Sequence, residues 1–333
     1  MKDKIIRISL VAGLLALLCS FTATLKANDL YVSGFWGYTV GAYTTGGATV
    51  NASLISGLAN PWGIAISGND LFVVNNGNGT VGEYTIAGAT INASLITGLS
   101  NPRSIAISGN NLFVANEGNG TVGQYTIAGA TINASLISGL NDVYGVAISG
   151  NDVFVVNAFN GTVGQYTTGG ATINASLISG LNYPTGIAIS GDNLFVANYL
   201  GGTVGEYTTG GATVNASLIS GLASPSAIAI SGNDLFVANF SNIGNFAGDV
   251  GEYGLDGSTV NASLISGIDA PAGITINPVP EPSADALVAL VAAAWCLRRC
   301  RKKFRTSVPR AREKLSANAS TICSIYELPN EQR

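Results

Sequence analysis

Short apolar runs separated by small polar residues fill the chain from residue 29 to residue 277. In one representative stretch, Ile and Ala alternate over residues 63–67, residues 71–74 are apolar throughout, and two more runs follow at 80–84 and 93–96. Gly, Asn and Asp occupy the intervals between these runs and favour tight turns. The pattern therefore predicts a unit of four short β-strands, of which the second is buried on both faces.

The same unit recurs along the chain. The phrase NASLI appears six times, at steps of 41, 41, 41, 41 and 46 residues. Its first residues are Asn51, Asn92, Asn133, Asn174, Asn215 and Asn261. A four-stranded antiparallel unit of about 40 to 45 residues has the size of a β-propeller blade. A parallel β-helix is the alternative architecture, but its coils have no reason to place hairpin turns between successive strands.

The two ends of the repeat region predict how the array closes. The chain enters at Asp29 with the second strand of a unit and leaves at residues 273–277 with a first strand. Five whole units lie between these ends, beginning at Gly63, Ser104, Gly145, Gly186 and Ala227. The two incomplete ends make a sixth unit together. The predicted fold is therefore all-β, a six-bladed β-propeller over residues 28–277 with four antiparallel strands per blade, closed by strand 273–277, which leaves no open end of the ring.

The order of elements within a unit resembles the NHL repeat and related six-bladed propeller families. Their units run proline, glycine, first strand, hairpin, second strand and a glycine–asparagine loop, and the matching stretch here is NPWGIAISGNDLFVVNNGNGTVGEY, residues 60–84. The resemblance covers nearly all of residues 29–277. Many relatives carry Asp at the end of the second strand, whereas this chain has Asn75, Asn116, Asn157, Asn198 and Asn239. This departure removes the basis for carrying acidic or metal-binding roles over to those positions.

The first 27 residues differ from the repeats. Lys2 and Lys4 precede an apolar run over about residues 8–18, and Ala27 stands at a plausible cleavage point. A positive start, an apolar run and a small residue in that order are typical of a secretory signal peptide. Residues 1–27 are therefore predicted to direct export of the protein.

Residues 278–303 carry, in order, the sequence VPEPS, a short apolar run and a cluster of basic residues. This order resembles the bacterial PEP-CTERM sorting signal. The resemblance implies that an exosortase-type enzyme in the inner membrane cuts near Pro280, Glu281 and Pro282 and passes the protein outward. The apolar run, 286–297, would span roughly 18 Å as a helix, against about 30 Å of hydrocarbon in a bilayer. That length suits transient insertion better than permanent anchoring.

The basic cluster begins with Arg298 and Arg299 and would keep its side of the segment in the cytoplasm. An ordinary weak tail anchor is the alternative interpretation of 278–303. PEP-CTERM signals normally stop soon after the basic cluster, but this chain continues through residues 304–333. This polar tail has no periodic pattern and is predicted to be disordered.

Charge separates the repeat region from the two ends of the chain. Between residues 29 and 277 there are thirteen acidic residues and one basic residue, Arg103, hence a net charge of −12. Such a region repels phosphate backbones, which argues against nucleic-acid binding. The chain has no histidine, and its four cysteines lie outside residues 28–277. Histidine-based acid–base catalysis and Cys/His metal sites are therefore excluded, and we expect no cofactor, no metal and no enzymatic activity.

A metal-dependent hydrolase is nevertheless an alternative, because six-bladed relatives include lactonase-like hydrolases that hold a metal through carboxylates at the central channel. In this chain Asp142 and Asp269 are the acidic residues that stand just before a channel-lining strand. The hydrolase hypothesis would require these two side chains, from different blades, to meet at one cation.

Two sets of positions differ between the otherwise similar units. One set stands just before each first strand: Trp62, Arg103, Tyr144, Thr185, Ser226 and Ala272. The other lies in the loop after each second strand and includes Phe35, Trp36, Glu117, Phe159, Tyr199, Phe240 and Phe246. In a propeller both sets emerge on the same face. Aromatic rings beside polar groups suit sugars, so the candidate ligand-binding residues are Phe35, Trp36, Trp62, Arg103, Tyr144, Phe159, Tyr199 and Phe240. The alternative is that these rings only cap the blades.

These patterns together predict a secreted, non-enzymatic propeller that binds or organises extracellular polysaccharide. Transient inner-membrane anchoring, followed by delivery to the outer surface or matrix of a Gram-negative-type bacterium, follows from the two terminal segments. A structural, self-associating surface protein is the alternative function.

Overall fold

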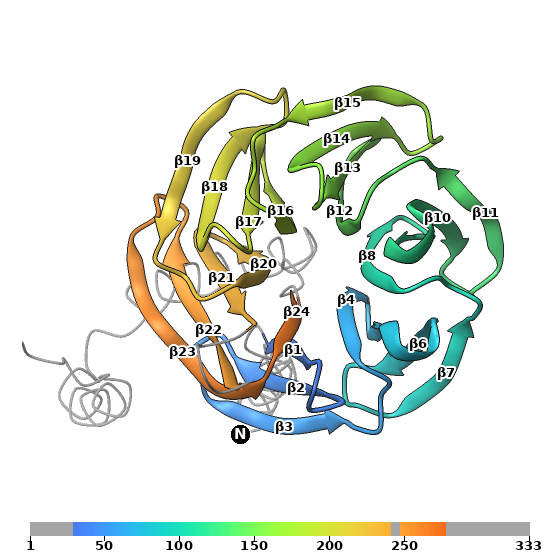
Figure 1. Ribbon diagram of the computed structural model, residues 1–333. Helices are drawn as coiled ribbons and strands as arrows, with labels where there is room; N and C mark the ends of the chain where they lie inside the picture. Colours follow the sequence, from blue (N-terminus) through green and yellow to red (C-terminus); the bar gives the residue numbers. More distant parts are fainter. Residues whose placement is uncertain (1–28, 241–246, 278–333) are drawn as a thin grey trace, which may run out of the picture. The chain divides into compact units, whose positions relative to one another are not determined.

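The computed structural model describes residues 29–240 and 247–277. In this part of the chain, twenty-four strands form six antiparallel sheets of four strands each, arranged as blades around a central axis (Figure 1). The predicted all-β, six-bladed β-propeller is therefore confirmed. The predicted signal peptide, sorting segment and tail lie outside the described residues. Among the residues that are described, no helix has the length and apolar character needed to cross a membrane.

Each blade runs from an innermost strand beside the axis to an outermost strand at the rim, and the blades are numbered 1 to 6 in the order of the strands below. The innermost strands are β24 (Pro271–Ile276), β4 (Pro61–Ser67), β8 (Pro102–Ser108), β12 (Val143–Ser149), β16 (Pro184–Ser190) and β20 (Pro225–Ser231). The second strands are β1 (Asp29–Gly34), β5 (Asp70–Asn75), β9 (Asn111–Asn116), β13 (Asp152–Asn157), β17 (Asn193–Asn198) and β21 (Asp234–Asn239).

The outer half of each blade consists of two further strands. The third strands are β2 (Thr39–Thr44), β6 (Thr80–Thr85), β10 (Thr121–Thr126), β14 (Thr162–Thr167), β18 (Thr203–Thr208) and β22 (Ala247–Gly254). The outermost strands are β3 (Thr49–Ile55), β7 (Thr90–Ile96), β11 (Thr131–Ile137), β15 (Thr172–Ile178), β19 (Thr213–Ser220) and β23 (Thr259–Asp269). Short 3₁₀ helices, η1 (Asn76–Asn78) and η2 (Glu117–Asn119), follow the second strands of blades 2 and 3.

Strands from the two ends of the repeat region close the ring, as predicted. In blade 1, β24 pairs antiparallel with β1, so that Leu30 lies opposite Ile276 and Val32 opposite Ile274. The Asn277 N–H donates to the Asp29 carbonyl at 3.0 Å. Ile274 also packs in a buried cluster with residues of blade 6. One blade is thus assembled from segments that are about 240 residues apart in the sequence.

The core lies between adjacent blades rather than within any one of them. Every residue from Leu71 to Val74 on β5 is fully buried. Leu71 and Val73 pack in a cluster with residues of blade 1, whereas Phe72 and Val74 pack with residues of blade 3. This alternation confirms the prediction that second strands are buried on both faces. It also means that each blade buries its apolar side chains against its two neighbours.

The predicted strand types are correct, but their bounds are too short. The largest difference is at the outermost strand of blade 2, predicted to start at residue 93 and observed from Thr90. Residues 90–94 are exposed, although Ile91 and Ala93 alternate with the polar Thr90, Asn92 and Ser94. Two register shifts interrupt the ladder between β6 and β7, one of them at the first residues of β7. This strand therefore pairs with β6 without burying its first five residues.

Candidate functional site

The innermost strands surround a central channel with a volume of about 300 Å³. At one end, which we call the mouth, it is bordered by the second residue of each innermost strand and by the loops after the second strands. The sequence pattern predicts that the first set, which includes Trp62, Arg103 and Tyr144, stands just before the strands. In the structure each of these residues is the second residue of its innermost strand, so its side chain has a fixed position on the sheet.

Aromatic rings from several blades contact one another across the mouth. Five of them form a closed circuit of neighbours: Trp62 and Tyr144 have ring centroids 6.0 Å apart, Tyr144 and Tyr183 5.6 Å, Tyr183 and Tyr199 6.3 Å, Tyr199 and Phe240 6.2 Å, and Phe240 and Trp62 5.6 Å. Most of these pairs meet edge to face, the geometry that ring quadrupoles prefer. Phe35 adds a contact of 5.0 Å to Trp62, and Trp36 lies 4.7 Å from Phe35.

The blades differ in which of the two mouth positions carries the large side chain that joins the cluster. Blades 2, 3 and 4 carry their large side chain on the innermost strand, as Trp62, Arg103 and Tyr144. Blades 5, 6 and 1 have the buried residues Thr185, Ser226 and Ala272 there and carry their large side chain in the loop, as Tyr199, Phe240 and Phe35. Thr185 and Ser226 instead donate to the proline carbonyls of the next blade, at 3.0 and 2.7 Å. All six blades therefore contribute at least one large side chain to the mouth, and Trp36 of blade 1 and Tyr183 of blade 5 add further rings.

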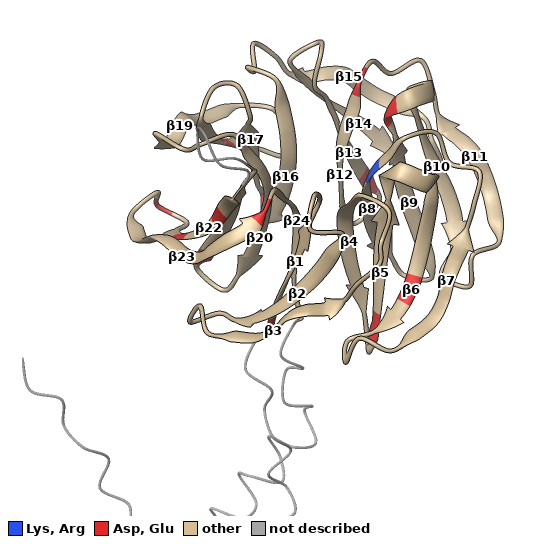
Figure 2. Ribbon diagram, turned by 60° about the horizontal axis from the view of Figure 1, so that its bottom comes forward, with Lys and Arg blue, Asp and Glu red and all other residues tan. Residues whose placement is uncertain are grey.

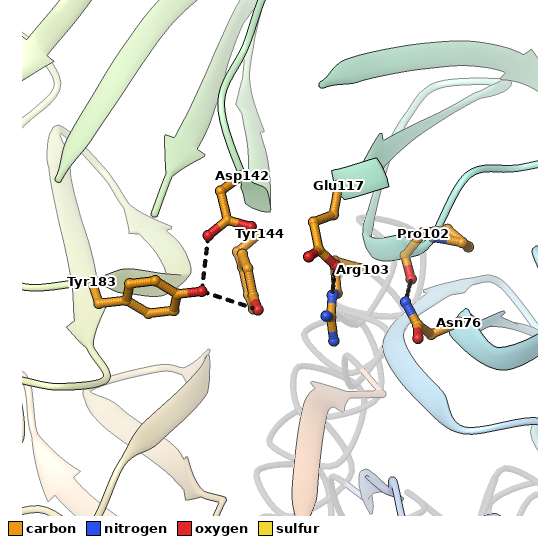
Figure 3. Close-up of polar contacts among 7 residues, drawn as sticks. All are labelled: Asn76, Pro102, Arg103, Glu117, Asp142, Tyr144 and Tyr183. Carbon is orange, nitrogen blue, oxygen red and sulfur yellow. Dashed lines mark hydrogen bonds and ion pairs between the residues drawn. The ribbon is translucent and has the colours of Figure 1, made fainter. Parts of the chain in front are cut away.

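Arg103 is held inside this aromatic cluster. Its guanidinium carbon lies 4.1 Å from the Trp62 ring centroid and 4.8 Å from that of Tyr144. Its Nε donates to Glu117 Oε2 at 2.5 Å (Figure 3). The two side chains are 14% and 22% exposed. The single cation of the propeller is thus both stacked between rings and neutralised by a carboxylate.

A second polar group at the mouth joins blades 4 and 5. The Tyr183 hydroxyl donates to Asp142 Oδ2 at 2.8 Å and lies 3.4 Å from the Tyr144 hydroxyl (Figure 3). Burial raises the pKa of Asp142, the Tyr183 hydrogen bond lowers it, and the negative charge of Glu117 raises it. Burial and the neighbouring Tyr144 and Asp142 raise the pKa of Tyr183, which therefore remains a neutral donor.

The backbone at the mouth is strained at the same position in every blade, and in blade 1 also at Tyr38. The residue before each innermost strand has a positive φ between 47° and 59°, although none of the six is glycine. They are Asn60, Asn101, Asp142, Tyr183, Ser224 and Ala270. Five of them precede proline, which disfavours helical conformations in the preceding residue. Such strain persists where the surrounding structure over-determines the backbone, commonly at ligand sites.

The asparagines at the ends of the second strands are structural. All five are buried. In blades 2 to 5 the Asn Nδ2 donates to a threonine hydroxyl at the start of the third strand, as Asn75 does to Thr80 at 3.3 Å. Within residues 29–240 and 247–277, no group of three or more Asp, Glu, His or Cys side chains could hold a metal ion. Asp142, required by the hydrolase hypothesis, is hydrogen-bonded to Tyr183.

Seven of the eight candidate residues come together at the mouth. They are Phe35, Trp36, Trp62, Arg103, Tyr144, Tyr199 and Phe240. The eighth, Phe159, stands on the loop of blade 4, is 74% exposed and has no ring contact with the others among the described residues. Phe246 lies outside the described residues. The cluster is more compact than the sequence suggested, because most of its rings are half-buried against each other, while Trp36 is 46% exposed.

Tyr183, Asp142 and Glu117 complete the mouth but were not among the candidate residues. A signal for the first two exists in the sequence. They occupy the position two residues before the variable set, which also differs in identity between units. Comparing the units at that position would have identified it as part of the same surface.

Comparisons with known proteins rest on structure alone. No protein-family model matches the chain, and no curated protein matches it. A chain in the crystal structure of a nidogen/laminin complex is 13% identical, with a TM-score of 0.63, over 75% of this chain and 98% of that one. The chain has the fold of a β-propeller. A protein of unknown function from Bacteroides caccae is likewise 13% identical, with a TM-score of 0.61. The match covers 77% of this propeller chain and 100% of the Bacteroides caccae chain.

Proposed function

We propose that this propeller is a secreted, non-enzymatic protein that binds polysaccharide at its mouth. The observation that carries the proposal is the cluster to which every blade contributes a large side chain, an aromatic ring in five blades and Arg103 in blade 3. Aromatic faces pack against the apolar faces of sugar rings, and the adjacent hydroxyl, guanidinium and carboxylate groups can bond to sugar hydroxyls.

The accessible part of this surface lies around the compact cluster. Trp36 and Tyr38, from the loop of blade 1, are 46% and 44% exposed, and Leu200, from blade 5, is 65% exposed. Asn101 is exposed at the same face and supplies an amide. A polymer crossing the mouth would therefore contact exposed rings at its edge, with the packed cluster beneath them as a rigid support.

Charge narrows the class of polysaccharide. The propeller carries a net charge of −12, and the guanidinium of Arg103 is already paired with Glu117. Acidic residues occur on several blades, whereas the one basic residue lies on β8 (Figure 2). A polymer of uronic acids would meet net repulsion and no unpaired cation. Neutral polymers and polymers of amino sugars are therefore the expected ligands.

The two terminal segments support export as part of the proposal. Residues 1–27 would direct secretion, and residues 278–303 would insert transiently in the inner membrane until an exosortase-type enzyme cuts near Pro280, Glu281 and Pro282. The propeller would then act at the outer surface or in the extracellular matrix.

Titration of residues 28–277 with neutral, amino-sugar and uronate polysaccharides tests the binding function. Trp36 and Trp62 are the tryptophans of this segment, and both belong to the mouth, so their emission reports on it directly. The proposal predicts a saturable change with a neutral or amino-sugar polymer. No change with any of the polymers, in a protein that is folded by circular dichroism, would contradict it.

A further inference from the structure

Large exposed hydrophobic residues gather at two places on the propeller. Among the described residues, four stand on loops of the mouth face: Trp36, Tyr38, Phe159 and Leu200. The other six each occupy the second position of an outermost strand: Val50, Ile91, Ile132, Ile173, Val214 and Val260, which are 50–59% exposed. The first group lies on the face that carries the proposed binding site. The second group forms a belt around the rim that the proposed function does not use.

Each residue of the belt lies on a strand with one open edge. The outermost strands pair with a third strand on one side and end their sheet on the other. The first five residues of each are exposed. The leucine and isoleucine that follow them are covered, because a turn of the neighbouring blade lies close to the leucine. A Cβ on Gly129, for example, would lie 2.5 Å from the Leu95 carbonyl oxygen. Five exposed residues per strand are thus available to a partner.

The five exposed residues at the start of each outermost strand are nearly identical in all six repeats, although they are not buried. All six outermost strands begin Thr-Val-Asn-Ala-Ser or Thr-Ile-Asn-Ala-Ser. At the mouth, by contrast, equivalent positions hold Trp, Arg, Tyr, Thr, Ser and Ala. The repeats have therefore diverged where the mouth is built and have kept an uncharged, partly apolar strand at the rim. Open edges of this kind ordinarily carry a charge, a proline or a β-bulge, each of which hinders pairing with other chains. The first five residues of these strands carry no charge and no proline, but β11 has two register shifts against β10, so pairing at this edge is expected to be weak.

Blade 3 is the blade at which two copies could approach without repulsion. It holds one acidic residue, Glu117 of η2, and one basic residue, Arg103 of β8, so its formal charge is zero. The third-strand residue opposite its outermost asparagine, Asn133, is the neutral Gln124. In blade 2 the equivalent residue is Glu83. With a net charge of −12 on the propeller, a contact between copies is least opposed at blade 3.

We propose that β11 of one molecule pairs antiparallel with β11 of a second copy of this chain. Centred on Asn133, this register places Ile132 opposite Ala134 and Thr131 opposite Ser135 of the partner. A large side chain then faces a small one, and hydroxyls face hydroxyls, which favours cross-strand packing. The contact is isologous and closes as a dimer with two-fold symmetry.

The dimer contact is small, and one backbone N–H at the edge of β11 already has a hydrogen-bond acceptor within its own molecule. The Ser135 N–H donates to Asn133 Oδ1 at 3.1 Å, so pairing exchanges this bond for one between chains. Five residues from each partner bury less surface than stable dimers do. The association is therefore weak and depends on protein concentration, which suits a surface where copies are crowded together.

Cysteine cross-linking tests this contact in residues 28–277, which contain every buried cluster of the described structure and no cysteine. Opposed residues of an antiparallel pair have Cα atoms about 4.5–5.5 Å apart, within the range of a disulfide. Asn133→Cys is expected to form disulfide-linked dimers on mild oxidation. Asn92→Cys, at the equivalent position of blade 2, is the matched control and is expected to remain several-fold less cross-linked.

Sedimentation velocity over a range of concentrations complements the cross-linking. Ile132→Lys is expected to abolish concentration-dependent dimers, whereas Ile91→Lys, a substitution of equal exposure on β7, leaves them. Equal cross-linking at residues 92 and 133, or wild-type protein that remains monomeric and uncross-linked, would overturn the proposal. Loss of polysaccharide binding in both lysine variants without any dimer would likewise overturn it and assign the belt to the glycan.

Discussion

The Arg103 guanidinium and the Glu117 carboxylate form an ion pair of 2.5 Å at the mouth of the channel. Both residues belong to blade 3, and the guanidinium also stacks between rings of blades 2 and 4. A planar guanidinium can make both contacts at once, whereas a lysine ammonium cannot. This pair therefore couples three blades at the surface that we propose binds polysaccharide.

The effects of substituting Arg103 and Glu117 on the free energy of unfolding should not add. Arg103→Lys is expected to destabilise residues 28–277 by about 1 kcal/mol through lost stacking. Arg103→Met combined with Glu117→Gln is expected to cost less than the sum of the two single substitutions, because each single substitution leaves an unpaired charge behind and the double substitution does not. Urea unfolding measures all of these free energies. Glu206→Gln in blade 5 is the control carboxylate, and additive effects at residues 103 and 117 would contradict the coupling.

The raised pKa of Asp142 predicts how stability depends on pH. Burial disfavours the charged carboxylate in the folded protein, so folding binds the proton more tightly than the unfolded chain does. The stabilising contribution of the protonated group is complete below the ordinary aspartate pKa of about 3.9. It is lost as the pH rises through the raised pKa.

The free energy of unfolding of the wild type relative to Asp142→Asn should therefore decrease between about pH 3 and pH 7. Asp192→Asn, at an exposed hairpin, controls for removing one negative charge from an acidic protein. Urea unfolding of the three proteins at both pH values measures the difference. A wild type that gains stability relative to Asp142→Asn as the pH rises would show that burial does not govern this carboxylate.

Ring closure predicts that a very short truncation has a large effect. A protein ending at Ala272 lacks the part of β24 that pairs with Leu30 and Val32, and it lacks the buried Ile274. Burial of one such side chain alone contributes about 1.5–3 kcal/mol. The loss should therefore exceed about 3 kcal/mol once the ladder is included, and thermal unfolding should remain a single transition at a lower temperature. A protein ending at Asn277 is the control, and equal stability of the two would contradict closure by β24.

The periodicity of this chain made its fold accessible from the sequence. Six copies of NASLI set the blade number, and the unbroken run Leu71 to Val74 indicated a strand buried on both faces. The incomplete units at the two ends indicated how β24 and β1 meet. The exposed start of the outermost strands was missed because residues such as Thr90 and Asn92 carry no burial pattern, and their conformation comes from pairing with β6.

The mouth was only partly predictable, for a physical reason. Variation between repeats identified Trp62, Arg103 and Tyr144, because each stands where a regular array would repeat one residue. It could not indicate that rings of different blades touch, since that depends on the diameter of the channel and on side-chain conformation. Phe159 varies like the others but has no ring contact with the cluster among the described residues and is 74% exposed.

The most direct test of the account is calorimetric titration of residues 28–277 with a soluble amino-sugar polymer, with Trp36→Ala and Phe159→Ala compared in parallel. Both substitutions remove an exposed aromatic side chain from the mouth face, but Trp36 alone contacts the cluster. The account predicts saturable binding that Trp36→Ala weakens about tenfold or more, a loss of at least about 1.4 kcal/mol, while Phe159→Ala leaves it within about twofold. Absence of binding to amino-sugar and neutral polymers by the folded protein, or equal losses in the two variants, would contradict it.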